Sequence, residues 1–264
     1  MAVNNGERYL ADALHSVSAQ TFTDWECLTV DDGSTDKSGE ILRQWAAADS
    51  RFCIITMPAN RGLAESLNTA LARARGDYVA RMDADDLCLR DRFLRQVDFL
   101  DAHPEITVLG TAALYIDEFG TLLRHVQMPQ DHECIVAQLP RRTSLIHPSV
   151  MMRREALRRA GGYDRHQRYA QDLELWARGA SLGWHFHNLR DPLLRYRSQP
   201  ASHPSHSWTV FWLRMRNGFT YGYPWRALFW ALVALVATSP WAVRRALRAW
   251  PVVFTRWCRS RTGA

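Results

Sequence analysis

Apolar residues in the first half of the chain recur at helical spacing in some segments and form short continuous runs in others. Leu10, Leu14 and Val17 lie at positions i, i+4 and i+7, which predicts an amphipathic helix. Further helices are predicted around residues 41–48, 62–75 and 93–100, and strands over residues 25–30, 52–57, 78–83 and 106–116. This alternation indicates an α/β fold with a mostly parallel, Rossmann-like sheet flanked by helices. Ligands of such sheets bind beyond the carboxyl ends of the strands.

The second half is less regular and leads into a separate region. Helices are predicted over residues 153–160, followed by a glycine C-cap, and over residues 172–182. Several prolines punctuate the stretch after residue 190, so we place a boundary near residue 205. The chain therefore divides into a main domain, residues 1–205, and a tail, residues 206–264.

The tail combines an uncharged apolar segment with flanking arginines. Residues 227–243 carry no charge, and their helical length falls just short of the roughly 30 Å hydrocarbon core of a bilayer. Trp225, Trp230 and Trp241 lie in or beside this segment, as is typical near a membrane interface. We expect a membrane-associated hairpin or marginal span, with residues 208–261 on the cytoplasmic face of the membrane. The alternative is an apolar helix packed on the main domain or in a dimer interface.

Composition and missing motifs narrow the classes of function. The net charge is +6 with arginines concentrated in the last third, which indicates an anionic surface there, phospholipid or nucleic acid; we favour the membrane and expect no nucleic-acid partner. The five cysteines include no Cys-x-x-Cys pair, so neither a zinc site nor a disulfide framework is expected. The chain starts with a polar turn, which does not indicate a signal peptide. P-loop and G-x-G-x-x-G motifs are absent, which disfavours P-loop NTPases and dinucleotide-binding dehydrogenases.

Three aspartates follow the apolar run that starts at Tyr78. Side chains two apart on a strand share a face, so Asp83 and Asp85 are expected to point the same way. Two converging carboxylates repel each other unless a cation lies between them, and hard oxygen ligands suit Mn²⁺ or Mg²⁺. We therefore predict a metal site at Asp83 and Asp85 that serves a bound diphosphate. The alternative is a solvated acidic turn.

Two other strand ends carry candidate nucleotide-binding residues. Asp31 and Asp32 close the strand over residues 25–30, where a carboxylate can accept a base N–H and a ribose hydroxyl. Asn60, Arg61 and Gly62 open the next helix, where backbone amides and an arginine can face a phosphate. Capped turns are the alternative explanation for both segments.

Asp172 opens the helix over residues 172–182, where the helix dipole favours its ionised form. An ionised carboxylate facing a cleft can take a proton from a hydroxyl nucleophile. The alternative is an ordinary residue of a helix start. His147, His185 and His187 are interpreted mainly as structural residues, with a minor role open to His147.

Taken together, these segments resemble the inverting family 2 glycosyltransferases of GT-A fold over roughly residues 3–200. The matching segments are residues 5–10, Ser18 to Phe22, Val30-Asp31-Asp32-Gly33-Ser34-Thr35-Asp36, Asn60-Arg61-Gly62-Leu63, residues 74–78, Met82-Asp83-Ala84-Asp85-Asp86 and Gln171-Asp172-Leu173-Glu174-Leu175-Trp176. The resemblance implies that Asp31 or Asp32 binds the nucleoside. It also implies that Asp83 and Asp85 form the Asp-x-Asp motif for metal and diphosphate, and that Asp172 is the general base.

The chain departs from the family pattern in three ways. Its start lies near the end of the family's first strand, so we expect that strand to be nearly missing and the chain to be truncated or begun too late. Gln171 stands where the family usually has glutamate. The Gln-x-x-Arg-Trp motif of processive synthases is absent, which favours single addition over polymerisation.

The resulting hypothesis is a metal-dependent, membrane-associated glycosyltransferase. It would move a sugar from a nucleotide-sugar donor to a hydroxyl of a lipid-linked glycan or envelope polysaccharide, with inversion. A nucleotidyltransferase of similar fold is one alternative, although its usual glycine-rich, basic N-terminal loop is not found. A non-enzymatic membrane-binding module is the other.

Overall fold

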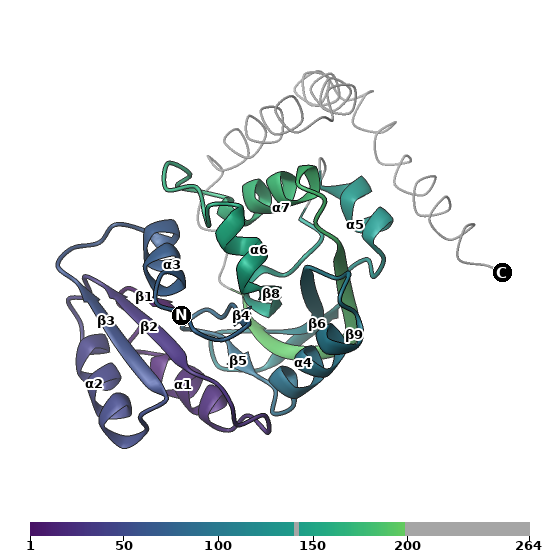
Figure 1. Ribbon diagram of the computed structural model, residues 1–264. Coiled ribbons are helices and arrows are strands. Elements are labelled where there is room, and N and C mark those ends of the chain that lie inside the picture. The colour runs from purple at the N-terminus through teal and green to yellow at the C-terminus, as the bar shows by residue number, and fades with distance from the viewer. Residues whose placement is uncertain (140–142, 199–264) are drawn as a thin grey trace, which may run out of the picture.

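The computed structural model describes residues 1–139 and 143–198. Its first part is a parallel three-stranded sheet in the order β1-β2-β3 with one helix after each strand. The elements are β1 (Ala2–Val3), α1 (Leu10–Ser18), β2 (Cys27–Asp32), α2 (Ser38–Ala48), β3 (Phe52–Met57) and α3 (Leu63–Leu71). Figure 1 shows α1 and α2 on one side of this sheet and α3 on the other. The predicted parallel sheet with helices on both faces is confirmed here.

The second part is a mixed sheet in the order β4-β8-β6-β9-β5, with β7 added to β6. Only β6 and β9 pair in parallel; the other pairings are antiparallel. The elements are β4 (Tyr78–Ala80), β5 (Leu87–Cys88), α4 (Arg92–Ala102), β6 (Val108–Ile116), β7 (Leu122–Val126), α5 (His132–Gln138), the 3-10 helix His147–Ser149, β8 (Met151–Arg153), α6 (Arg154–Arg159), α7 (Gln171–Ser181) and β9 (Phe186–Arg197). The sequence did not indicate β7, β8 or β9.

The two largest core clusters of the described residues fill faces of the sheets, and the apolar spacing explains them. The buried residues of α1 are Leu10, Ala13, Leu14 and Val17, at the i, i+3, i+4, i+7 spacing of one helix face. They pack in a cluster with residues of α2, β3 and α4. The other cluster joins α3, α6 and α7 around Trp176, which is fully buried.

The junction between the two sheets is built by β1, which is only two residues long. Its Ala2 pairs with Val30 of β2 and also forms an isolated parallel bridge to Asp83 beyond β4. Figure 1 shows the N-terminus between the two sheets. Beside it lies a cavity of about 700 Å³, whose lining includes Leu28 of β2 and Val79 of β4. The first strand is thus as short as the sequence predicted.

Residues 206–264, including the apolar segment 227–243, lie outside the described residues, so the predicted tail remains a prediction. Within residues 1–139 and 143–198, no helix is both long and apolar enough to cross a bilayer.

Candidate active site

The predicted site residues of the first sheet gather where its parallel strands end. Val3 of β1 pairs with Asp31 of β2, and the neighbouring Ala2 bridges to Asp83 on the other side. β2 extends to Asp32, two residues beyond the predicted end, so Asp31 and Asp32 are its last two residues. Because carboxyl ends of parallel strands meet at one edge, Asp31 and Asp83 flank the end of β1.

Asp32 holds the segment that precedes α3. Its Oδ1 accepts the N–H of Arg61 at 2.7 Å, and its Oδ2 accepts the N–H of Gly62 at 2.8 Å. Asp31 Oδ1 accepts the N–H of Ser34 at 3.0 Å. Asn60 and Arg61 are exposed at the same edge. The amides of Arg61 and Gly62 therefore face a carboxylate in this structure, and the phosphate contact at this segment remains a prediction.

Gly33 permits this close approach of the two loops. Its φ is +66°, and a Cβ there would lie 2.6 Å from the backbone N of Asn60. A side chain at this position would therefore separate the turn after β2 from the segment before α3.

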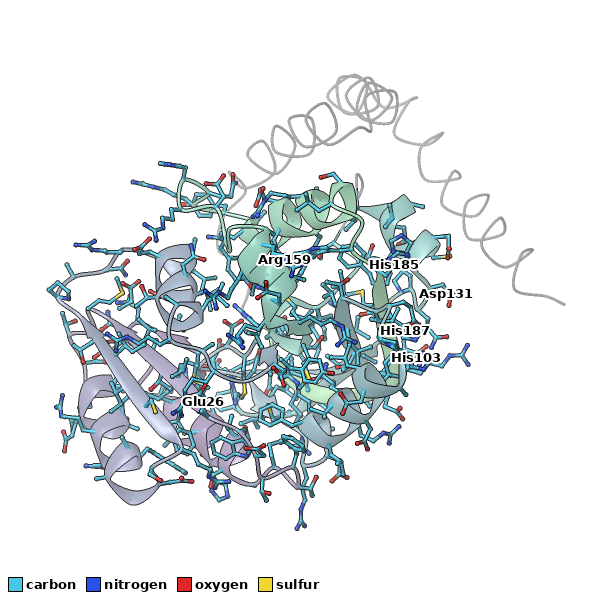
Figure 2. The ribbon with its side chains drawn as sticks, in the orientation of Figure 1. Glu26, His103, Asp131, Arg159, His185 and His187 are labelled. Atoms are coloured by element: carbon cyan, nitrogen blue, oxygen red, sulfur yellow. The ribbon has the colours of Figure 1, made fainter. Side chains whose placement is uncertain are left out.

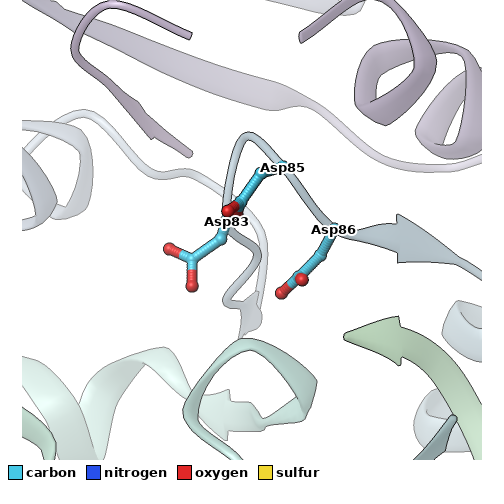
Figure 3. Close-up of side chains that lie close together, drawn as sticks. All are labelled: Asp83, Asp85 and Asp86. Atoms are coloured by element: carbon cyan, nitrogen blue, oxygen red, sulfur yellow. The ribbon is translucent and has the colours of Figure 1, made fainter. Parts of the chain in front are cut away.

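The acidic turn between β4 and β5 brings three carboxylates together. One oxygen each from Asp83, Asp85 and Asp86 lie within 4.8 Å of one another, and Figure 3 shows the three side chains on this turn. The strand ends at Ala80 and residues 84–85 form a turn, so the expectation that strand alternation aligns Asp83 with Asp85 is wrong. The turn itself makes them converge and adds Asp86, which was not predicted as a site residue.

The environment of Asp86 fits a cation. Asp86 is 1% exposed, and its Oδ1 accepts the backbone N–H of Arg197 at 2.8 Å. Its Oδ2 is buried and has no hydrogen-bond partner among the described residues. Burial, and then the charge of Asp83, raises the pKa of Asp86 well above its ordinary value. A divalent cation would neutralise this crowding, and an all-oxygen donor set suits Mg²⁺ or Mn²⁺.

Arg81 was also missed by the sequence interpretation, although it lies two residues before Asp83. Its Nη1 donates to Asp83 Oδ2 and its Nη2 lies against Asp83 Oδ1, both at 2.5 Å. The side chain is almost fully buried, and its Nε has no hydrogen-bond partner among the described residues. One carboxylate of the acidic turn is thus already paired with a cation of the chain.

Asp172 lies at the start of α7, after Ala170 with a left-handed φ of 52° and ψ of 41°. Such a conformation is strained for alanine and is typical of residues held at functional sites. Burial raises the pKa of Asp172, and it outweighs the opposing effects of the Leu173 N–H and the charge of Arg81. The helix start was expected to favour the ionised form of this carboxyl, and burial opposes that effect. A raised pKa makes its carboxylate a stronger base.

The histidines are divided between the site and the far side of the second sheet. His147 Nε2 lies 2.9 Å from the hydroxyl of Tyr163, and burial followed by the charge of Arg81 lowers the pKa of His147 well below its ordinary value. His185 and His187 instead lie with His103 on the side that carries α5 and β9 (Figure 2). His187 stacks on Phe99, with ring centroids 4.9 Å apart. The structural interpretation of these two histidines agrees with this geometry.

Comparison with known proteins identifies a family and several relatives. Residues 1–161 match the sequence model of a protein family that is described as glycosyl transferase family 2. EpsE of Bacillus subtilis, which is named as a glycosyltransferase, is 36% identical over 212 residues, covering 79% of this chain and 75% of that protein. The amylovoran biosynthesis glycosyltransferase AmsE of Erwinia amylovora is 33% identical over 190 residues, covering 72% of this chain and 70% of that protein.

Solved structures share the fold at lower sequence identity. S. aureus TarS 1–349 in complex with UDP matches with a TM-score of 0.65 at 19% identity, covering 84% of this chain but only 64% of that one. The mannosyltransferase PcManGT from Pyrobaculum calidifontis, in complex with GDP-Man and Mn²⁺, matches with a TM-score of 0.58 at 20% identity. The match covers 99% of this chain and 80% of that one. These likenesses confirm the predicted GT-A type of fold.

Proposed function

The chain belongs to glycosyl transferase family 2, and we propose that it transfers one sugar at a time from a nucleotide-sugar donor to an acceptor hydroxyl, with inversion and with the help of a divalent metal ion. The observation that carries this proposal is the convergence of Asp83, Asp85 and Asp86 on the turn between β4 and β5, beside β1 of the parallel sheet. Asp172 supplies a carboxylate within the electrostatic reach of Arg81, which pairs with Asp83.

The donor would bind along the carboxyl edge of the parallel sheet. Asp31 and Asp32 would bind the nucleoside, and Asn60, Arg61 and Gly62 would border the phosphates. Asp83 and Asp85, joined by Asp86, would hold Mn²⁺ or Mg²⁺. When bound, such an ion stabilises the negative charge that develops on a departing diphosphate. The structure of PcManGT with GDP-Man and Mn²⁺ supports this arrangement by analogy of fold.

Asp172 would act as the general base. Its carboxylate takes the proton from the acceptor hydroxyl while that oxygen attacks the anomeric carbon and the bond from this carbon to the diphosphate oxygen breaks. A single displacement from the opposite face inverts the configuration of the sugar. The raised pKa of Asp172 supports this role, because proton transfer to a stronger base is more favourable.

The acceptor would be a lipid-linked glycan or an envelope polysaccharide. The names of two relatives support a biosynthetic role: AmsE is named for amylovoran biosynthesis, and a Bacillus subtilis protein, TuaG, 40% identical over 96 residues, for teichuronic acid biosynthesis. Binding of residues 208–261 to the cytoplasmic face of the membrane would bring the site to a lipid-linked acceptor.

Thermal shift and product analysis test this function. Melting curves with UDP, GDP, dTDP and CDP, each with and without Mn²⁺, should single out one nucleotide that stabilises the protein only with the metal. Transfer assays with the matching donor should release a nucleoside diphosphate; release of pyrophosphate would instead indicate a nucleotidyltransferase.

Two variants test the assigned roles. Asp85→Asn and Asp172→Asn should each lower transfer at least about a hundredfold, whereas Asp98→Asn on the exposed side of α4 should retain activity. Full activity in both Asp85→Asn and Asp172→Asn would contradict the proposed mechanism. Asp83→Asn is a poorer probe, because it also removes the partner of the buried Arg81.

A further inference from the structure

Arg81 is fixed at the centre of the candidate site by its backbone as well as its side chain. Its N–H donates to the carbonyl of Val150 at 2.9 Å, and its own carbonyl accepts from Nη2 of Arg92 at 2.8 Å. The guanidinium spans both oxygens of Asp83 in a bidentate contact. Charge-assisted pairs of this geometry are among the strongest polar contacts in proteins.

The positive charge of Arg81 faces acidic groups on several elements. It acts on Asp86 of the same turn and on Asp172 of α7, where it opposes the effect of burial on each pKa. It also lies within reach of His147 and Tyr163. The Nε of Arg81 remains buried without a partner among the described residues. The guanidinium therefore interacts electrostatically with several carboxylates, while one of its nitrogens, Nε, makes no hydrogen bond with the described residues.

A divalent ion held by all three carboxylates of the acidic turn would take an oxygen of Asp83, yet both oxygens of Asp83 already contact the guanidinium. We propose that Arg81 takes the place of the divalent cation on Asp83 in the unloaded protein, and that Asp83 exchanges the guanidinium for the ion when the site loads. This proposal rests on the metal dependence proposed above. It makes Arg81 a positioning residue that regulates metal loading.

The exchange has a measurable consequence for affinity. A guanidinium beside the ion competes for Asp83 and repels the ion, so wild-type protein without nucleotide should bind the metal weakly. Removing the charge of Arg81 should tighten binding, although it leaves the acidic turn unneutralised in the absence of metal. A merely structural arginine would have the opposite effect, since its loss would loosen the turn and weaken the site.

Mn²⁺ titrations of nucleotide-free protein, followed by electron paramagnetic resonance, test the proposal. Arg81→Met should bind Mn²⁺ at least about tenfold more tightly than wild type, because an ion and a guanidinium that both contact Asp83 would lie roughly 4 Å apart, where like charges repel by more than the free energy of a tenfold change. Arg81→Lys keeps the charge and should stay near wild type. The matched control is Arg178→Met, which removes another arginine paired with a buried carboxylate, Glu174. It should change Mn²⁺ affinity by no more than about twofold.

Unchanged or weaker Mn²⁺ binding in Arg81→Met overturns the proposal. If that variant does not fold, the wild type decides through nitrogen-15 NMR of the arginine side chains, with Arg81→Lys used for assignment. A clamped guanidinium gives separate Nη signals, and saturating Mg²⁺ should let those of Arg81 merge; persistence of the separate signals overturns the proposal. If wild type transfers sugar only with Mn²⁺, but Arg81→Met binds Mn²⁺ no more tightly or the separate Nη signals persist, the exchange at Asp83 is excluded and the proposed metal dependence stands. Metal-independent transfer with no Mn²⁺ binding by any variant removes the proposed metal dependence and the inference with it.

Discussion

Arg197 anchors the acidic turn to the second sheet, so its replacement tests how the site is built. The residue ends β9 and is 6% exposed. Its Nε donates to the backbone carbonyl of Asp85 at 2.9 Å. Its Nη1 donates to the carbonyls of Asp117 and Glu118, each at 2.9 Å. One guanidinium thus fixes the turn that carries Asp85 relative to the connection after β6.

The magnitude follows from these contacts. Arg197→Met keeps the backbone hydrogen bond to Asp86 and removes the three side-chain hydrogen bonds. Hydrogen bonds from a charged group contribute about 1.5 kcal/mol or more each, so together they reach about 4 to 5 kcal/mol. The cation–π contact with Tyr9, at 4.1 Å to the ring centroid, is also lost, but methionine still packs on the ring. We therefore expect the free energy of unfolding to fall by about 3 to 5 kcal/mol.

Urea denaturation followed by far-UV circular dichroism measures this loss. Arg195→Met is the control, because Arg195 is exposed on the same strand and its replacement should change the free energy of unfolding by less than about 0.5 kcal/mol. Mn²⁺ affinity should also fall in Arg197→Met but not in Arg195→Met. A loss below about 1 kcal/mol in Arg197→Met would refute the anchoring role, as would equal losses in the two variants.

Two further expectations concern pH and the cavity beside β1. Burial lowers the pKa of His147, so unfolding takes up a proton as the pH falls below about 6.5, and stability drops by up to about 1.4 kcal/mol per pH unit for this group. His147→Gln should flatten that slope in urea titrations between about pH 7 and about pH 5; an unchanged slope would contradict the assignment. A short extension of alternating apolar residues ahead of Met1 should raise the melting temperature, because it can fill the cavity and pair with the side of β4 that faces away from β8. A Gly-Ser extension of equal length is the control, and equal melting temperatures would count against this expectation.

Local periodicity predicted the first sheet well because each of its helices and strands carries a recognisable apolar spacing within its own segment. The buried positions of α1 and the apolar run of β3 can be recognised from spacing alone. The strand β9 cannot, since it contains His187, Asp191 and Pro192 and its burial alternates only in part. Its stability comes from pairing with β6, far away in the sequence, with a register shift at Pro192. Such partners are invisible to a local pattern.

The candidate site shows the same division between local and distant determinants. Asp83 and Asp85 stand out in the sequence because several acidic residues lie within a short segment. Arg197 approaches Asp86 from 111 residues away, and no feature near Arg197 marks it as part of the site. Burial raises the pKa of Asp172, and the sequence pattern did not reveal that burial. The candidate carboxylates Asp83 and Asp85 could be recognised in the sequence, whereas the charged residues that hold or crowd them, Arg81, Asp86 and Arg197, could not.

The charge balance of the site argues that donor and metal bind interdependently. The four carboxylates Asp83, Asp85, Asp86 and Asp172 outnumber the two buried arginines that contact this turn, Arg81 and Arg197. A diphosphate would meet net repulsion there unless a divalent ion entered with it, and the ion would in turn gain ligands from the diphosphate. Because coupling between two ligands is reciprocal, the nucleotide must strengthen metal binding by the factor by which the metal strengthens nucleotide binding. A coupling factor well above one, measured both in Mn²⁺ titrations with nucleotide and in nucleotide titrations with Mn²⁺, would support this interdependence, whereas a nucleoside diphosphate that binds equally well without metal would exclude it.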